Sequence, residues 1–112
     1  MQQIRSIIFY KDYFTSFYVR QKESVRKKIN QVLMLIQTQQ RISSKFLKHI
    51  ETTGGLYEIR IEVAGDIYRI FCCFDKGNLV VLFNAFQKKS QKTPKQEIIK
   101  AQYIMKEYLQ TQ

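Results

Sequence analysis

The chain has 112 residues, 45% of them hydrophobic, and its 19 Lys and Arg against nine Asp and Glu give a net charge of +10. The apolar content excludes a disordered chain, and the length predicts a single domain over residues 1–112. So large a positive charge favours a polyanionic partner, nucleic acid first, ahead of an anionic membrane surface, an acidic protein or a charge that serves solubility alone. Because no apolar run approaches the roughly 20 residues of a membrane span and charges interrupt the N-terminal segment, we expect a cytoplasmic protein.

The first part of the chain predicts a strand followed by two helices. Residues 4–10 are rich in strand-forming side chains. Apolar side chains then recur at helical spacing in two stretches: Tyr13, Phe14, Phe17 and Tyr18, then Val25, Ile29, Val32, Leu33 and Ile36. We expect a helical hairpin packed on a sheet, with these basic residues around its outer side: Arg20, Lys22, Arg26, Lys27 and Lys28. Within residues 42–53, a short helix is predicted to dock through Phe46, Leu47 and Ile50 before a two-glycine break.

The second part predicts three strands. Residues 56–63 alternate, so that one face carries Tyr57, Ile59, Ile61 and Val63 and the other carries Glu58, Arg60 and Glu62. A turn at Gly65-Asp66 leads to a strand over residues 67–74, and a turn at residues 76–78 leads to a strand over residues 79–86. This last strand is almost wholly apolar apart from Asn84, which predicts a central position buried on both faces.

The chain ends in a predicted helix with Thr93 as its N-cap and Pro94 at its first position. Its apolar stripe is Ile98, Ala101, Met105, Tyr108 and Leu109. The predicted fold class is therefore α+β: a small antiparallel-rich sheet with an N-terminal helical hairpin and a C-terminal helix.

Two arginines are expected to meet on one face of the first hairpin. With Gly65-Asp66 as the loop, Glu62 faces Arg69, Arg60 is a diagonal neighbour of Arg69, and Glu58 shares their face. Guanidinium groups present planar donors that suit phosphate oxygens. A cross-strand ion pair between Glu62 and Arg69 on a solvated face explains the same pattern, and the residues do not choose between these interpretations.

A lysine cluster follows the last strand, where Lys88, Lys89 and Lys92 precede the predicted helix. A helix N-terminus and a lysine cluster both favour anions, although lysine runs are commonly solvated loops. The position of this run, at the end of a strand beside the arginine hairpin, favours anion binding.

Other chemistries find little support in the sequence. A single histidine, His49, excludes a paired-histidine mechanism, and Asp12, Asp66 and Asp75 lack metal-loop spacing. Neighbouring residues in a strand point to opposite faces, so Cys72 and Cys73 are predicted to be reduced core residues. We expect neither a metal nor a cofactor.

Three blocks of residues now carry a resemblance: Leu56-Tyr57-Glu58-Ile59-Arg60, Tyr68-Arg69-Ile70-Phe71, and residues 86–94 (FQKKSQKTP), continued by Glu97, Ile98 and Ala101. In this order and spacing, over nearly the whole chain, they resemble the phage-derived, HigB-like toxins of the RelE superfamily. The resemblance implies a RelE-like fold and a ribosome-dependent endoribonuclease that cuts translated mRNA. It also implies a cognate antitoxin, expected to be a helix-turn-helix protein.

The same resemblance implies which residues act. Arg60, Arg69 and the Lys88-Lys89 pair would hold the scissile phosphate, with Lys88 or Lys89 also a candidate acid. RelE has a lysine-rich site where this chain has Glu58 beside Arg60. A glutamate serves as general base in some relatives, so Glu58 is the candidate base, and the identity of the base stays open. Lys92 and Lys95 are expected to bind RNA.

Alternatives remain at this point. A module that grips RNA or the ribosome without cutting it would look similar, whereas a DNA-binding regulator is disfavoured because no helix-turn-helix stands out. The antitoxin would either cover Arg60, Arg69 and Lys88 or dock remotely on the helical hairpin, whose basic residues are expected to form a surface separate from the catalytic face.

Overall fold

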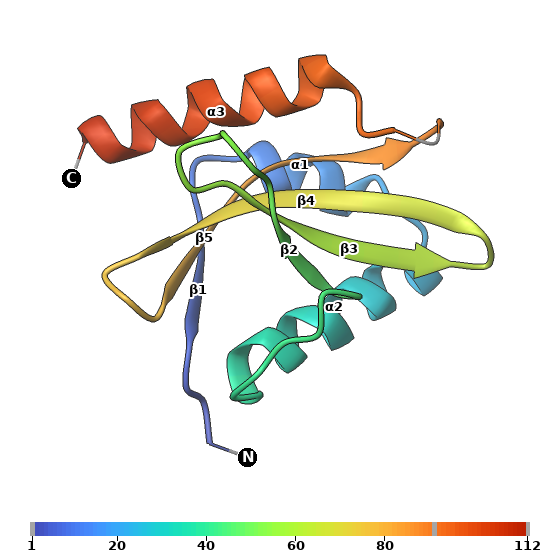
Figure 1. The fold of residues 1–112 in the computed structure, drawn as a ribbon. Coiled ribbons are helices and arrows are strands. Elements are labelled where there is room, and N and C mark those ends of the chain that lie inside the picture. Colours follow the sequence, from blue (N-terminus) through green and yellow to red (C-terminus); the bar gives the residue numbers. More distant parts are fainter. Residues whose placement is uncertain (1, 91, 112) are drawn as a thin grey trace.

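The computed structural model describes residues 2–90 and 92–111 (Figure 1). In chain order its elements are the strand β1 (Ser6–Phe9), the helices α1 (Tyr13–Val19) and α2 (Glu23–Thr38), the strands β2 (Leu47–His49), β3 (Tyr57–Val63), β4 (Asp66–Asp75) and β5 (Leu79–Lys88), and the helix α3 (Lys95–Gln110). Within the described residues, no helix combines the length and the apolarity that crossing a bilayer requires.

The five strands form one mixed sheet in the order β1-β5-β4-β3-β2. β1 runs parallel to β5, and the other neighbours are antiparallel. Helices α1 and α2 pack on one face of the sheet and α3 packs on the other (Figure 1). The prediction of an α+β fold with an antiparallel-rich sheet, N-terminal helices and a C-terminal helix is confirmed.

The face toward α1 and α2 is closed by apolar side chains at helical spacing. Phe14 and Phe17 of α1 and Val25, Ile29, Val32 and Ile36 of α2 are buried against alternate residues of the strands. Arg5 joins β1 to α2, because its guanidinium donates to the carbonyls of Ile36 (3.0 Å), Gln39 (2.6 Å) and Gln40 (2.9 Å). These bonds satisfy carbonyls that a helix C-terminus leaves without intrahelical partners.

The opposite face is covered by α3 over part of its area. Ala101, Ile104, Met105 and Tyr108 of α3 are buried against Phe71, Cys73, Val81 and Phe83 of the sheet.

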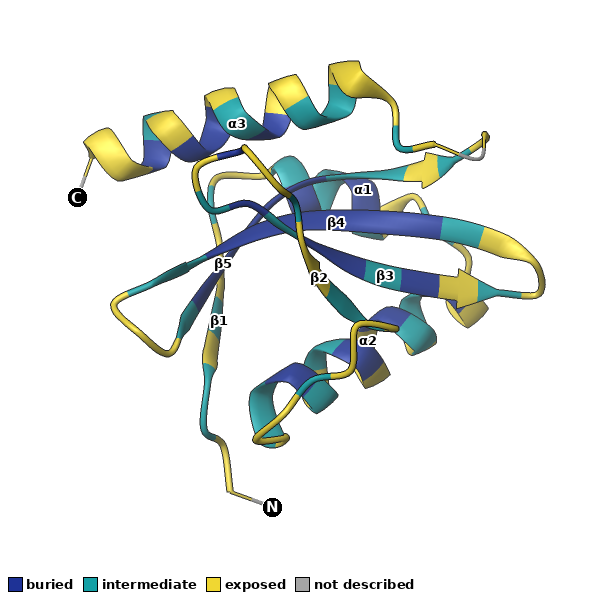
Figure 2. Cartoon of the chain, viewed as in Figure 1, coloured by how far each residue is buried: buried dark blue, intermediate teal, exposed yellow. Residues whose placement is uncertain are grey.

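Cys72 lies in the α1–α2 core and Cys73 in the α3 core, as strand alternation predicts. Burial raises the pKa of both thiols, that of Cys73 to about 11, so both remain protonated core residues. Figure 2 shows the middle of β4 dark blue, whereas the turns at its two ends are yellow.

The predicted short helix within residues 42–53 is wrong. Leu47–His49 forms β2 and pairs antiparallel with Tyr57–Ile59 of β3. Backbone hydrogen bonds extend this pairing at both ends, from Arg60 N to Phe46 O (2.8 Å) and from Ile50 N to Leu56 O (2.9 Å). The edge of β3 therefore determines the conformation of a segment that has no strong periodicity of its own.

The predicted turn between β3 and β4 is displaced by one residue. Val63 pairs with Asp66, so the loop is Ala64-Gly65, and both of these residues have positive φ (51° and 87°). Such a two-residue turn suits the twist of a hairpin, although Ala is an uncommon residue there. In the observed register Arg60 lies directly opposite Arg69, and Glu62 lies opposite Ile67. The predicted facing of Glu62 and Arg69, and the diagonal placement of Arg60, are both wrong.

The predicted N-terminus of α3 also needs correction. The helix begins at Lys95, Pro94 precedes it with φ −59° and ψ 131°, and no side chain caps it. Thr93 therefore lies before the cap position. Of the predicted apolar stripe, Leu109 remains exposed while Ile104 is buried instead.

Candidate active site

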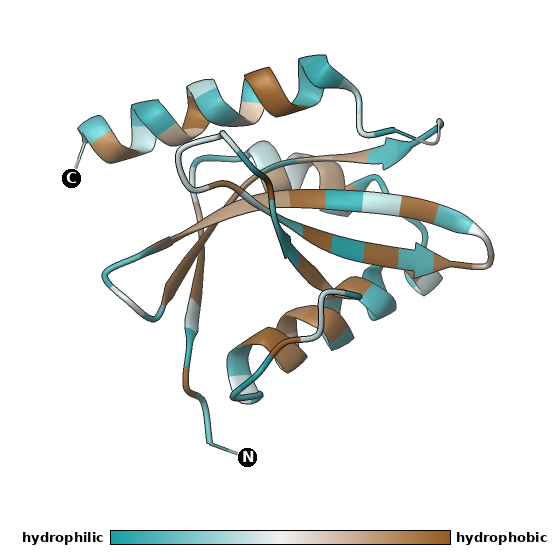
Figure 3. Ribbon diagram, in the orientation of Figure 1, coloured by the Kyte–Doolittle hydropathy of each residue, from teal (hydrophilic) through white to brown (hydrophobic). Residues whose placement is uncertain are grey.

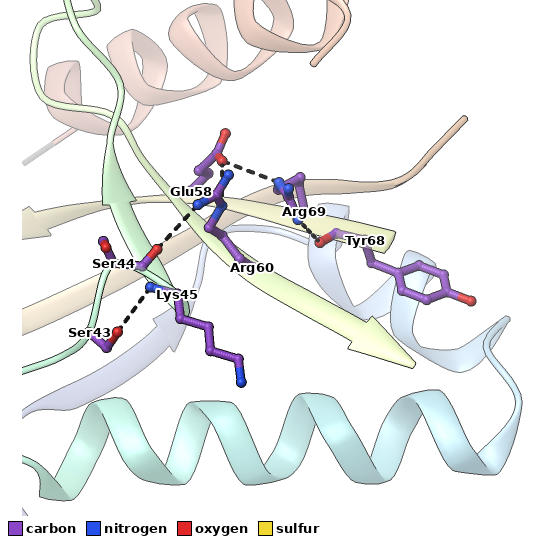
Figure 4. A network of polar contacts seen from close by, with 7 residues as sticks. All are labelled: Ser43, Ser44, Lys45, Glu58, Arg60, Tyr68 and Arg69. Carbon is purple, nitrogen blue, oxygen red and sulfur yellow. Dashed lines mark hydrogen bonds and ion pairs between the residues drawn. The ribbon is translucent and has the colours of Figure 1, made fainter. Parts of the chain in front are cut away.

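A buried carboxylate lies between two arginines on the α3 face of the sheet (Figure 4). Glu58 Oε2 is 3.1 Å from Arg60 Nε and 3.2 Å from Arg69 Nε. Because Arg60 and Arg69 are opposite each other on neighbouring strands, their side chains extend from adjacent points of the same face. The alternative ion pair between Glu62 and Arg69 does not form, since the partner of Arg69 is Glu58.

The two arginines differ in their access to solvent. The Arg69 side chain is 8% exposed and donates from Nη1 to its own strand at Tyr68 O (3.1 Å). The Arg60 side chain is 31% exposed and donates from Nη1 to Ser44 O (3.3 Å). Arg69 is thus a fixed cation inside the site rather than a residue on a solvated face, and Arg60 connects it to the surface.

The ion pairs leave donor capacity unused. Neither Nε–H of the two arginines is aligned for a hydrogen bond, although both nitrogens are buried. Burial lowers the pKa of Arg69, the nearby Glu58 carboxylate raises it, and the charge of Arg60 lowers it again. A guanidinium nevertheless stays charged near neutral pH. Two guanidinium groups and a single carboxylate leave this site a net positive charge, which favours binding of an anion.

Lys88 at the end of β5 completes the cluster. It lies opposite Ile67, two residues beyond the position on β5 that faces Arg69. Burial lowers the pKa of Lys88, and the positive charges of Arg69 and Arg60 lower it further, against the opposing effect of Glu58. Two arginines therefore pair with one carboxylate at this site, and Lys88 lies close enough to be influenced by all three charges.

The remaining predicted site residues lie further out. Lys89 and Lys92 are exposed between β5 and α3, and Lys95 is exposed in the first turn of α3. None of the three takes part in an ion pair within residues 2–90 and 92–111. They are therefore not part of the Glu58 cluster.

A pocket of about 390 Å³ opens beside the start of β2, where the edge of β3 has no neighbouring strand. Its lining residues are Lys28, Lys45, Phe46, Arg60, Ile61, Glu62 and Arg69. Sequence reasoning missed the contributions of Lys28, Lys45 and Phe46. Lys28 was expected on a surface separate from the catalytic face, but it lines the same pocket as Arg60 and Arg69. No sequence motif joins α2 to the turn before β2, so only the folded chain reveals this proximity.

The structure also places the single histidine and shows whether a metal ion could be held. His49 is exposed on β2, where its ring lies 5.0 Å from that of Tyr57. Across residues 2–90 and 92–111, no three His, Cys, Asp or Glu side chains gather in a way that could hold a metal ion. What the cluster offers is cationic charge, hydrogen-bond donors and one carboxylate.

Comparison with known proteins places the chain in a family. No curated protein matches it at a significant level. A family model described as "Phage derived protein Gp49-like (DUF891)" matches residues 17–106, which include Glu58, Arg60, Arg69 and Lys88. The match runs from α1 to α3 and covers well over half of the chain. The chain therefore belongs to the Gp49-like family of phage-derived proteins, which is part of the RelE/HigB toxin-like group.

Proposed function

We propose that this protein is the toxin of a type II toxin–antitoxin system, of the HigB type, and that it cleaves mRNA on the ribosome. The observation that carries the proposal is the pair of Arg60 and Arg69 on the buried Glu58, with Lys88 nearby, at a place where both arginines line a pocket. Family membership supports the role of toxin, and the cluster supports phosphoryl chemistry.

The cluster suits cleavage through the 2′-hydroxyl group of RNA. The 2′ oxygen attacks the adjacent phosphorus, so that an O2′–P bond forms as the P–O5′ bond breaks. One product carries a 2′,3′-cyclic phosphate and the other a 5′-hydroxyl group. A base takes the proton of the 2′-hydroxyl, an acid supplies one to the leaving O5′, and Arg60 and Arg69 stabilise the charge on the non-bridging oxygens.

Lys88 is the proposed acid. An ordinary lysine holds its proton too tightly to donate it readily near neutral pH. Burial and the nearby positive charge of Arg69 lower the pKa of Lys88, so Lys88 releases its proton more readily than an ordinary lysine. Lys89, exposed and one residue further along, is assigned to RNA binding with Lys92 and Lys95.

Glu58 is both the proposed base and a positioning group. Its Oε2 holds the two guanidinium groups together, which leaves Oε1 as the oxygen that accepts the 2′ proton. The same contacts favour one rival function. With Oε2 shared by two arginines, the carboxylate would serve structure alone, and the protein would bind RNA or the ribosome without cutting it.

Product chemistry separates the two functions. Purified protein is added to ribosomes translating a defined mRNA, and the new RNA ends are mapped. The proposal expects 2′,3′-cyclic or 3′-phosphate ends, and growth arrest with halted translation on expression in cells. Translation that stops with intact mRNA would support the binding module. Unchanged translation in cells that accumulate folded protein would contradict the toxin role itself.

A helix-turn-helix antitoxin is the proposed partner. Arg26, whose side chain donates to the Gln21 carbonyl, and Lys27, which pairs with Glu23, both lie on α2 outside the lining of the pocket. If docking is remote, reversing the charges of Arg26 and Lys27 together weakens antitoxin binding while cleavage persists. If only substitutions of Arg60 or Lys88 disturb the complex, the antitoxin covers the active site directly.

A further inference from the structure

The proposed reaction uses only one wall of the pocket beside β3. Arg60 and Arg69 belong to the active site, whereas Lys28, Lys45, Phe46 and Ile61 have no part in the chemistry. These four residues come from α2, from the turn before β2 and from the other face of β3. They extend the site around the free edge of the sheet.

Phe46 is held at this edge by its backbone. Its N–H donates to Ser43 O (2.9 Å), and its carbonyl accepts from the N–H of Arg60 (2.8 Å), which places Phe46 beside Arg60. Two ammonium groups stand over its ring, with Lys45 Nζ 5.5 Å and Lys28 Nζ 6.0 Å from the ring centre. Figure 4 shows the side chain of Lys45 extending from this turn toward α2.

The lining has a mixed chemistry that a bare phosphate does not explain. Four cations and one carboxylate favour an anion, while the half-buried ring of Phe46 presents apolar surface. The volume of about 390 Å³ lies in the range of roughly 300–1,000 Å³ that small-molecule sites occupy. Single-stranded nucleic acid combines an anionic backbone with flat bases, and proteins bind it by placing aromatic rings beside basic side chains.

We propose that this pocket binds one nucleotide of single-stranded RNA, with its base against Phe46 and its phosphate toward Arg60 and Arg69. The RNA then crosses the sheet from Lys88 on β5, over Arg69 and Arg60, to the free edge of β3. The orientation of this path rests on the proposed nuclease function, whereas the nucleotide pocket itself is testable by binding alone.

The probe is a 2′-O-methyl hexa-adenylate, which cannot be cleaved because its 2′ oxygens are blocked. Binding is followed at low salt by the amide NMR signals of Lys45, Phe46, Arg60 and Ile61. Phe46→Leu keeps most of the apolar volume and removes the aromatic face, and we expect it to weaken binding about tenfold, as loss of one base–aromatic stack does. Phe46→Trp should bind at least as tightly as the wild type. Phe74→Leu is the matched control, since Phe74 is a half-buried aromatic of the same core that does not line the pocket.

Three outcomes would overturn the proposal. One is equal binding by Phe46→Leu and wild type, and another is the absence of any shift at these amides in millimolar oligonucleotide. The third is tighter binding of an acidic Glu-Glu-Phe-Glu-Glu peptide at the same amides, which would make the pocket a peptide site. Because the probe is uncleavable, a protein that binds it through Phe46 yet fails to cut ribosome-bound mRNA would contradict the nuclease function and leave the pocket standing.

Discussion

On the face of the sheet that carries α3, the same strands build two regions with opposite properties. In the covered region, Phe71, Cys73 and Phe83 are buried beneath α3. In the second region, called open here because it borders the pocket, Arg60 and Arg69 pair with the buried Glu58, and Lys88 lies opposite Ile67 on β5. Arg69 and Phe71 are only two residues apart on one strand and point the same way, yet one serves the site and the other the core. Figure 3 shows this change as teal segments that interrupt the brown ones along β4.

Strand alternation decides which face of the sheet a residue occupies. Whether α3 covers that part of the face then decides whether the residue belongs to the core or to the site. α3 begins at Lys95, and its first turn is held by Asn84, whose amide donates to the backbone and the side chain of Glu97 (both 3.4 Å). Phe86 stacks on Phe71 with ring centres 5.8 Å apart and forms the boundary between the regions. Substitutions on either side of this boundary should therefore separate stability from activity.

The largest effect is expected in the covered region. Phe71→Ala removes a fully buried ring and should lower the free energy of unfolding by about 3–5 kcal/mol. RNA binding by the fraction that remains folded should stay near the wild-type level, because the cations are untouched. Urea denaturation and oligonucleotide titration below the unfolding midpoint would measure the two quantities. A stable variant that loses binding would contradict the division of the face.

In the open region, Arg69→Lys should spare the fold and damage catalysis. The positive charge stays beside Glu58, but the planar donors that fit a phosphate are lost, so cleavage should fall by about a hundredfold or more. Arg69→Ala should lose activity and also stability, because Glu58 then keeps a single cationic partner in a buried place. Single-turnover cleavage and thermal unfolding would be compared with Lys106→Ala, an exposed charge on α3. An active Arg69→Lys variant would remove Arg69 from the reaction.

Lys88 should show its role in the pH dependence of cleavage. Its pKa lies below the ordinary 10.5, and an acid must carry its proton, so cleavage should fall as pH rises through that lowered pKa. Lys88→Arg keeps the charge, but a guanidinium holds its proton too tightly to act as an acid, so cleavage should slow by about a hundredfold while RNA binding persists. Loss of the alkaline fall in this variant would confirm the assignment. An identical pH profile in both proteins would leave Lys88 a purely electrostatic residue.

The smallest effect is expected for Tyr108→Phe at the far end of the covered region. The Tyr108 hydroxyl donates to Asp75 Oδ2 at 2.7 Å, and its loss should lower stability by roughly 1–2 kcal/mol without affecting cleavage. Burial and this bond raise the pKa of Tyr108 to about 12. Because the pKa is raised on folding, the contribution is complete below pH 10 and declines as pH rises toward 12. Chemical denaturation at pH 8 and pH 11.5 should therefore show a smaller difference between variant and wild type at the higher pH.

The strands that carry the site were predictable because their residues alternate. Glu58 and Arg60 on one face, with Ile59 and Ile61 on the other, follow from the two-residue period of β3. The register was not predictable in the same way, since Ala64 occupies a backbone conformation that its residue type disfavours and the Gly-Asp pair beside it looked the better turn.

The pocket shows a second limit of the sequence. Lys28, Lys45 and Phe46 belong to a helix and to a turn, and nothing in their local pattern points to Arg60. β2 was missed for a related reason, because its three residues become a strand through the hydrogen bonds that β3 offers them. Contacts between distant segments lie beyond what periodicity reports.

The parallel pairing of β1 with β5 has a consequence for the order of folding. Ser6 pairs with Leu79, whereas β3, β4 and β5 are joined by short turns. Closing the long loop between β1 and β5 costs more conformational entropy than closing either hairpin, so the three-strand meander should assemble first and β1 should join late. Arg60 and Arg69 would then come together before β1 adds to the edge of the sheet at β5. Pulse-labelling hydrogen exchange during refolding would test this order, since the amides of Ile59 and Ile70, which pair across β3 and β4, should become protected before those of Ser6 and Ile8.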